Sequence, residues 1–255
     1  MHDRPNGAPS VRPITTTDIR ESLRAGAQDF AAAPVPGLFF ASFYVFVGLI
    51  MAWITYTTGT TFWLVLAVMG FPLIGAFAAL GLYETSRRRT AGEPLNLREI
   101  TGVVWAHKVG QLPWLAVILV ILFLFWFFLG HMIFALFLGL SPMTNVSDST
   151  EVYFSTNGLK MLSFGTIIGA AFAGLTFALS VLGMPMFLDR DVDFVTAMIT
   201  SFQAVRARPF IYFGWGAFIG TVTIIAMIPA FLGLFIAMPV LGHATWHLYK
   251  AVTRP

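Results

Sequence analysis

The sequence contains no cysteine and few charged residues. The lack of cysteine excludes disulfides, thiolate catalysis and iron–sulfur ligation by this chain. Only 11% of its 255 residues are charged, whereas soluble domains carry about 25%. No Asp, Glu, Lys or Arg lies deep within the long apolar runs, which argues against a proton relay or an ion-coupled transporter. No phosphate-binding glycine loop, Ser/His/Asp set or zinc motif occurs, so we expect neither enzymatic activity nor a nucleic-acid partner.

Hydrophobic residues make up 57% of the chain. Several apolar runs exceed the roughly 18 residues that distinguish membrane spans from buried core helices. These runs do not alternate apolar and polar residues as the strands of a membrane barrel do. The sequence therefore predicts an all-α, polytopic helical membrane protein in contact with the lipid bilayer.

About six transmembrane helices are expected, in three hairpins. The paired runs are 37–57 with 62–83, 112–140 with 159–188, and 210–228 with 232–249. The last run is short and polar at its end, so it could instead be re-entrant, which would leave five spans. Residues 1–16 are rich in Pro, Gly, Ser and Arg and are expected to be a disordered tail. Residues 17–255 are expected to form a single transmembrane domain.

An amphipathic helix precedes each hairpin, and this order suggests three repeat units at 17–90, 91–188 and 189–255. The first and last of these helices space their apolar residues alike, by 4, 4 and 3 positions: Ile19, Leu23, Ala27 and Phe30, then Phe194, Met198, Phe202 and Val205. Such spacing places each set on one helix face. Asp18 and Asp193 precede these faces as helix-start signals. A proline near the exit of every second span predicts helix kinks, at Pro72, Pro185 and Pro239.

The basic residues set the expected orientation. Of the 15 Lys and Arg residues, only Lys160 lies in a loop within a hairpin. The positive-inside rule then places both termini and the amphipathic helices in the cytoplasm. Glu84 and the three arginines that follow at 87–89 are interpreted as a solvated cluster at lipid headgroups. Aromatic belts are expected at the two boundaries: Trp105, Trp114, Tyr212, Trp215, Trp246 and Tyr249 inside, and Trp53, Tyr56 and Trp63 outside.

Three histidines are the candidate cofactor ligands. His243 and His247 are four residues apart and share a helix face. With His107 at the same level, they could bind haem, while no carboxylate or cysteine completes a metal site. The alternative interpretation is that they are polar residues at the wet end of the last span. Close helix packing is predicted at Gly165, Gly169, Gly216 and Gly220, either within the chain or with another subunit.

The run Pro239-Val-Leu-Gly-His-Ala-Thr-Trp-His247, which follows an amphipathic helix ending in RARPF, resembles a proteobacterial family of predicted integral membrane proteins of unknown function. Some members are labelled cytochrome c oxidase subunit I. That catalytic subunit needs six histidine ligands on about twelve spans, and this chain has only five histidines. The resemblance therefore implies a bacterial inner-membrane protein with an accessory or assembly role near a respiratory or other bioenergetic complex.

The sequence leaves three functions open. The first is a non-catalytic membrane protein that acts through other membrane-protein subunits or copies of itself. The second is a transporter of small molecules or lipids, since internal repeats are common in transporters. The third is a haem- or metal-binding membrane protein that uses the histidine pair.

Overall fold

The computed structural model describes residues 5–59, 62–139 and 151–253, without the side chains of residues 62–74 and 151–152. Within these ranges the chain is helical, and its only β-structure is an isolated bridge between Asn6 and Asp191. The predicted all-α class is confirmed.

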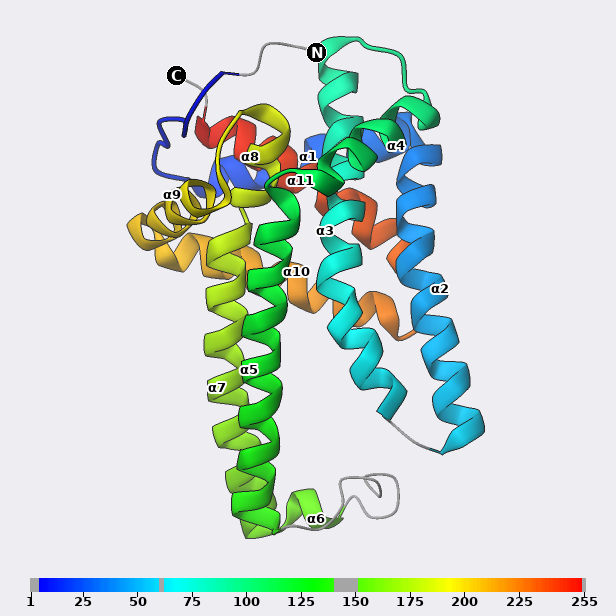
Figure 1. The fold of residues 1–255 in the computed structure, drawn as a ribbon, viewed down its shortest axis with the longest axis vertical. Helices are drawn as coiled ribbons and strands as arrows, with labels where there is room; N and C mark the ends of the chain where they lie inside the picture. The colour runs from blue at the N-terminus through cyan, green and yellow to red at the C-terminus, as the bar shows by residue number, and fades with distance from the viewer. Residues whose placement is uncertain (1–4, 60–61, 140–150, 254–255) are drawn as a thin grey trace.

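Six long helices correspond to the six predicted apolar runs (Figure 1). They are α2 (Pro34–Thr58), α3 (Phe62–Ala91), α5 (Leu112–Leu138), α7 (Thr156–Ser180), α10 (Pro209–Met227) and α11 (Leu234–Thr253). The shorter helices are α1 (Thr16–Ala32), α4 (Leu97–Ala106), α6 (Glu151–Phe154), α8 (Gly183–Asp189) and α9 (Phe194–Ala207). A proline lies in the first turn of α2, α5 and α10, where a missing N–H costs no helical hydrogen bond. The order of amphipathic helices α1, α4 and α9 matches the predicted units, whose status as repeats stays a prediction.

Four helical segments among the described residues are long and apolar enough to cross a membrane: Pro34–Thr58, Leu112–Leu138, Thr156–Asp189 and Pro209–Met227. The chain is therefore a multi-pass helical membrane protein by length and composition. The predicted count of six spans in three hairpins is finer than this observation and stays a prediction.

The long helices do not all run in one direction. In Figure 1, α5 and α7 lie side by side along the long axis, whereas α10 runs across that axis. The turn between α10 and α11 packs against the middle of α2, because a Cβ built on Gly48 would lie 2.7 Å from Phe231 Cδ1. Gly48 precedes the end of α2 at Thr58 by ten residues, or about 15 Å of helix. The α10–α11 turn therefore stops well short of the far end of α2.

Helix kinks are predicted at three prolines, and the structure differs among them. Pro185 lies in α8, and the helix breaks at residues 181–182, just where a proline removes the hydrogen bond to the carbonyl four residues earlier. The N–H of Leu182, which is the N-cap residue of α8, donates to Ser201 Oγ of α9 at 3.1 Å. Pro239 lies inside α11, which continues on both sides of it. Pro72 falls in the part of α3 whose side chains are not described.

The structure describes residues 5–15 of the segment predicted as a disordered tail at 1–16, and these residues contact the rest of the chain. Gly7 N donates to Asp191 O at 2.9 Å, and Arg12 N donates to Val252 O at 2.9 Å. The side chain of Ile14 is 1% exposed and belongs to the core. Backbone hydrogen bonds and one buried apolar side chain thus give residues 5–15 a defined path. Arg12 thus contacts the last residues of α11. We call this part of the molecule the terminal end.

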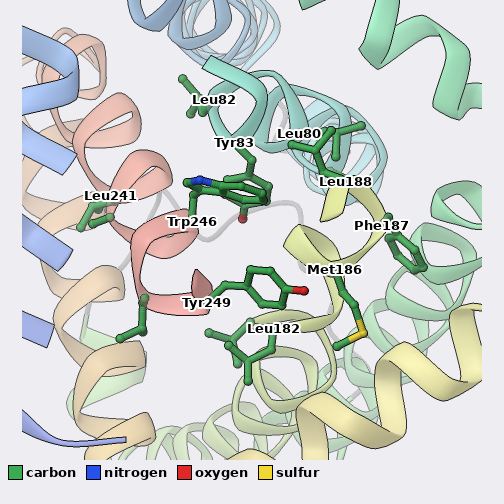
Figure 2. Packing of buried hydrophobic residues seen from close by; sticks show 14 of the residues in the cluster. Leu80, Leu82, Tyr83, Leu182, Met186, Phe187, Leu188, Leu241, Trp246 and Tyr249 are labelled. Carbon is green, nitrogen blue, oxygen red and sulfur yellow. The ribbon is translucent and has the colours of Figure 1, made fainter. Parts of the chain in front are cut away.

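A tightly packed aromatic core occupies the terminal end, where α3, α8 and α11 meet (Figure 2). Trp246 stacks on Tyr83 with 6.4 Å between ring centroids, and Trp246 and Tyr249 are 2% and 0% exposed. Their prediction as headgroup-level anchors is wrong, as it is for the equally buried Tyr212 and Trp215. Trp105, Trp114, Trp53 and Tyr56 are exposed, whereas Trp63 lies among the side chains that are not described.

Candidate functional site

Helix α1 packs on α11 through a polar face. Its buried residues are Asp18, Ser22, Gly26 and Asp29, whereas the predicted apolar face lies one position further along and is only half-buried, with Ala27 exposed. The helix also starts earlier than predicted, because Thr15 is the N-cap and Asp18 completes a capping box with it. The buried residues of α1 are thus also spaced by 4, 4 and 3 positions, but they are small and polar rather than large and apolar.

Gly26 brings the backbones of α1 and α11 together. A Cβ built on Gly26 would lie 2.6 Å from both Ala244 N and Val240 O. Real Cβ atoms do not approach backbone atoms so closely, so only glycine fits at this crossing. The close approach holds Asp29, one turn further along α1, against α11.

Asp29 is the centre of a buried polar cluster. Its carboxylate, 2% exposed, lies 2.7 Å from His247 Nε2 and forms an ion pair with Arg89 of α3. Burial acts to raise the pKa of Asp29, but hydrogen bonds from His247, Ser86 and Arg89 outweigh it and lower the pKa. The cluster therefore holds an ionised carboxylate and ties three helices together at the terminal end.

His243 extends this cluster into the interior. It is 0% exposed, and its Nδ1 lies 2.8 Å from Ser86 Oγ and 3.0 Å from Leu82 O. Nε2 is buried and has no hydrogen-bond partner. Ser86 therefore links His243 to Asp29, and the two histidines of the predicted pair reach the same cluster by different routes.

The structure does not bring His107 to this pair. Its ring nitrogens contact two carbonyls, Val103 O at 2.8 Å and Phe187 O at 3.3 Å. No group of three His, Cys, Asp or Glu side chains that could hold a metal ion occurs in the described part of the chain. Both ring nitrogens of His107 and Nε2 of His247 contact oxygen atoms of the chain, whereas His243 keeps Nε2 without a hydrogen-bond partner.

Arg87 and Arg88 form an ion-pair network around the buried carboxylate of Glu84 rather than a solvated cluster. Glu84 is 1% exposed and binds Arg87 and Arg88, each at 2.7 Å. Arg87 also binds Glu93 at 2.9 Å, and Arg88 binds Glu99 of α4. The earlier interpretation of free charges at lipid headgroups is therefore wrong for Arg87 and Arg88.

A further pair closes the site beside the aromatic core. Asp189 at the end of α8 accepts hydrogen bonds from Tyr249 Oη and Lys250 Nζ, both at 2.9 Å. A pocket lies between α3, α8 and α11, and its lining comprises Arg87, Thr90, Ala91, Asp189, Trp246, His247 and Lys250. The cations that line it are each bound to carboxylates of the same chain, so the pocket has no unpaired charge to offer a ligand.

The ion pair of Asp18 secures the start of α1. Asp18 Oδ1 lies 2.6 Å from a terminal nitrogen of Arg12, and its other oxygen accepts from Thr15. Hydrogen bonding to Arg12, aided by Thr15, lowers the pKa of Asp18 to about 2 in spite of burial.

Two of the four predicted packing glycines face aromatic rings of this chain. A Cβ built on Gly169 would lie 3.2 Å from Trp126 Nε1, and one on Gly216 would lie 3.3 Å from the Phe177 ring. Gly165 and Gly220 have open space instead. The closest approaches occur at glycines that the small-xxx-small pattern does not identify, such as Gly26.

A model of a family described as predicted integral membrane protein (DUF2189) matches residues 64–189. The match covers α3 to α8 and does not include the run that ends at His247, on which the resemblance was noted. No curated protein and no solved structure matches the chain.

Proposed function

Residues 64–189 match the model of a family of predicted integral membrane proteins, and from this premise we propose a non-catalytic protein that acts through contacts with other membrane proteins. The narrower form of this proposal is an accessory or assembly factor of a respiratory or other bioenergetic complex. The proposed location of the protein is a bacterial inner membrane, with both termini in the cytoplasm.

The observation that carries the proposal is how the chain divides its polar and apolar groups. At the terminal end, carboxylates such as Asp29, Glu84 and Asp189 are bound by cations of the same chain. Along the long helices the apolar side chains point outward: Phe125, Phe128 and Leu136 of α5 are 61%, 66% and 76% exposed. Such a surface is suited to lipid and to the apolar faces of membrane partners.

Purification from native membranes in a mild detergent, followed by mass spectrometry, tests this function. A stoichiometric oxidase or other complex is expected to copurify. The double variant Phe125→Ala, Phe128→Ala should weaken that association, whereas Gln28→Ala on the exposed face of α1 should not. Recovery of the chain alone or as a homo-oligomer would contradict the accessory role.

Topology is the second part of the proposal. Five spans, with only the last run re-entrant, would place the two termini on opposite sides. Six full spans keep the termini on one side, and so does a form with four spans in which α10 and α11 together make a re-entrant hairpin. The position of the α10–α11 turn beside Gly48 favours the re-entrant form. Because the chain has no cysteine, a single cysteine at Ala230 can be labelled with a membrane-impermeant maleimide. Labelling from the outer side indicates six spans, and no labelling from either side indicates the re-entrant form.

Transport is the second candidate function. Discontinuous helices and hairpins that end within the bilayer often form transporter sites, and the chain has a break at residues 181–182 and a turn at the middle of α2. Substrate flux into vesicles that contain the purified protein tests this function. Haem binding is the third candidate, and a Soret band that disappears in His243→Ala would support it.

A further inference from the structure

The buried face of α9 is made mostly of small residues, and Val205 at its edge is also buried. Ala197, Ser201 and Ala204 are 0%, 0% and 8% exposed. They pack where α7 breaks, since Ser201 accepts the hydrogen bond of Leu182 N and a Cβ built on Gly183 would lie 3.4 Å from Ala197 O. This contact fixes the rotation of α9 about its axis.

The opposite side of α9 carries a row of large apolar residues. Val195, Ile199 and Phe202 are 44%, 51% and 42% exposed. At 3.6 residues per turn they lie on one side of the helix, away from the small face. Gln203 is exposed on a third side, between the other two. The helix therefore presents one side to protein, one apolar side to its surroundings and one polar side. We call Val195, Ile199 and Phe202 the outer row.

The connections of α9 set its level. It begins five residues after the candidate span Thr156–Asp189 and ends two residues before the candidate span Pro209–Met227. In Figure 1 it lies beside the end of α7, across the direction of that helix. Trp114, 59% exposed, stacks on Phe194 at 6.3 Å between centroids. A helix joined at both ends to spans is held at the boundary between bilayer and water.

Two arginines at the end of α9 have no carboxylate partner among the described residues. Arg206 and Arg208 are exposed and form no ion pair with any residue that the structure describes. No Asp or Glu follows Asp193 in the sequence. The two guanidinium groups thus have positive charge to offer a phosphate group, unlike Arg87 and Arg88.

We propose that α9 is a binding surface for anionic phospholipid. The outer row lies among the acyl chains, Gln203 faces water, and Arg206 and Arg208 bind the phosphate groups of anionic headgroups. The long stem of arginine allows the charged group of Arg206 to reach the headgroup level from the apolar side. This inference goes beyond the proposed function, because it assigns a lipid contact whatever protein partner the chain has.

Single cysteines test the position of the outer row in the full-length protein. Val195→Cys, Ile199→Cys, Phe202→Cys and the matched control Gln203→Cys are spin-labelled in vesicles of phosphatidylglycerol and phosphatidylcholine. Collisions with oxygen, which concentrates in lipid, are compared with collisions with a water-soluble nickel chelate. The oxygen-to-nickel ratio is expected to be several-fold higher at the three outer-row sites than at the control. An equal ratio at all four sites overturns the proposal, as does spin–spin broadening in the outer row, which would mean that a second copy covers it.

Lipid selectivity tests the role of the arginines. The wild-type protein is expected to enrich spin-labelled phosphatidylglycerol over phosphatidylcholine. Each of Arg206→Gln and Arg208→Gln should reduce that enrichment about fivefold, the equivalent of ~1 kcal/mol per basic side chain at an anionic surface. Arg20→Gln and Arg24→Gln, at exposed positions of α1, are the controls and should leave it unchanged. Unchanged enrichment in the α9 variants, or equal losses in all four, overturns the headgroup assignment.

Discussion

Replacing Gly26 by alanine tests the packing of α1 on α11 most directly. The added Cβ would lie 2.6 Å from Ala244 N and from Val240 O, and 2.9 Å from Ala244 Cα. All three are backbone atoms, so no side-chain rotation can relieve the contact. Gly102 in α4 is the matched control, since its Cβ would meet nothing within 4 Å.

The two substitutions should act in opposite directions. Alanine in place of glycine within an unhindered helix is more stable by roughly 0.5–1 kcal/mol, and this gain is expected at Gly102. At Gly26 the same gain is present, but overpacking costs about 1–3 kcal/mol and forces α1 away from α11. Gly26→Ala should therefore be less stable than the wild type by about 1–2 kcal/mol.

Thermal unfolding in one detergent, followed by circular dichroism, measures both effects. For a chain of this size, 1 kcal/mol shifts Tm by about 2–4 °C. Gly26→Ala should melt several degrees below the wild type and Gly102→Ala slightly above it. If Gly26→Ala melts at or above the wild-type temperature, the backbone contact between α1 and α11 does not exist as described.

Three further predictions concern buried polar groups. Asp29→Asn should destabilise the protein by about 1–3 kcal/mol in the same melt, because Arg89 loses its counter-ion in a partly buried site; an unchanged Tm would contradict the role of Asp29. The low pKa of Asp18 should add stability that is complete above about pH 4 and is lost as the pH falls through about 2. At about 1.4 kcal/mol per pKa unit this amounts to ~2 kcal/mol, and less remains after solvent screening; Asp18→Asn should abolish this part of the acid dependence of Tm. Ser201→Ala should cost about 1–3 kcal/mol by leaving a buried N–H unpaired, whereas Ser163→Ala, at an exposed hydroxyl bonded within its own helix, should cost nothing measurable.

Several helix boundaries could be predicted because their signals are local. The run predicted at 112–140 is α5, Leu112–Leu138, and the run at 210–228 is α10, Pro209–Met227. Asp193 caps α9 as predicted, through Thr196 N at 2.9 Å. Proline, a capping side chain and uninterrupted apolar residues all act within a few positions along the chain, so one sequence contains them.

The polar cluster could not be predicted because its partners are far apart in the sequence. Asp29 and His247 are 218 residues apart, and Ser86 and His243 are 157 apart. No spacing rule connects such positions, since their contact depends on how α1, α3 and α11 pack. The i, i+4 pair of histidines indicated a shared helix face, but not that a carboxylate and a serine from two other helices would bind them.

The predicted apolar face of α1 lies one step from the residues that are buried, and so does that of α9 except for Val205, which is buried as predicted. Both differences have the same physical reason. In water, large apolar side chains are buried, and an amphipathic helix turns its Leu, Ile and Phe residues toward the core. At a membrane boundary, lipid accepts those side chains equally well, so helices approach most closely through small residues. Gly26 and Ser22 on α1, and Ala197 and Ser201 on α9, are buried accordingly. In the lipid contact that we propose, the outer row of α9 faces the acyl chains, whereas the large apolar residues of α1 lie half-buried at the edge of its contact with α11.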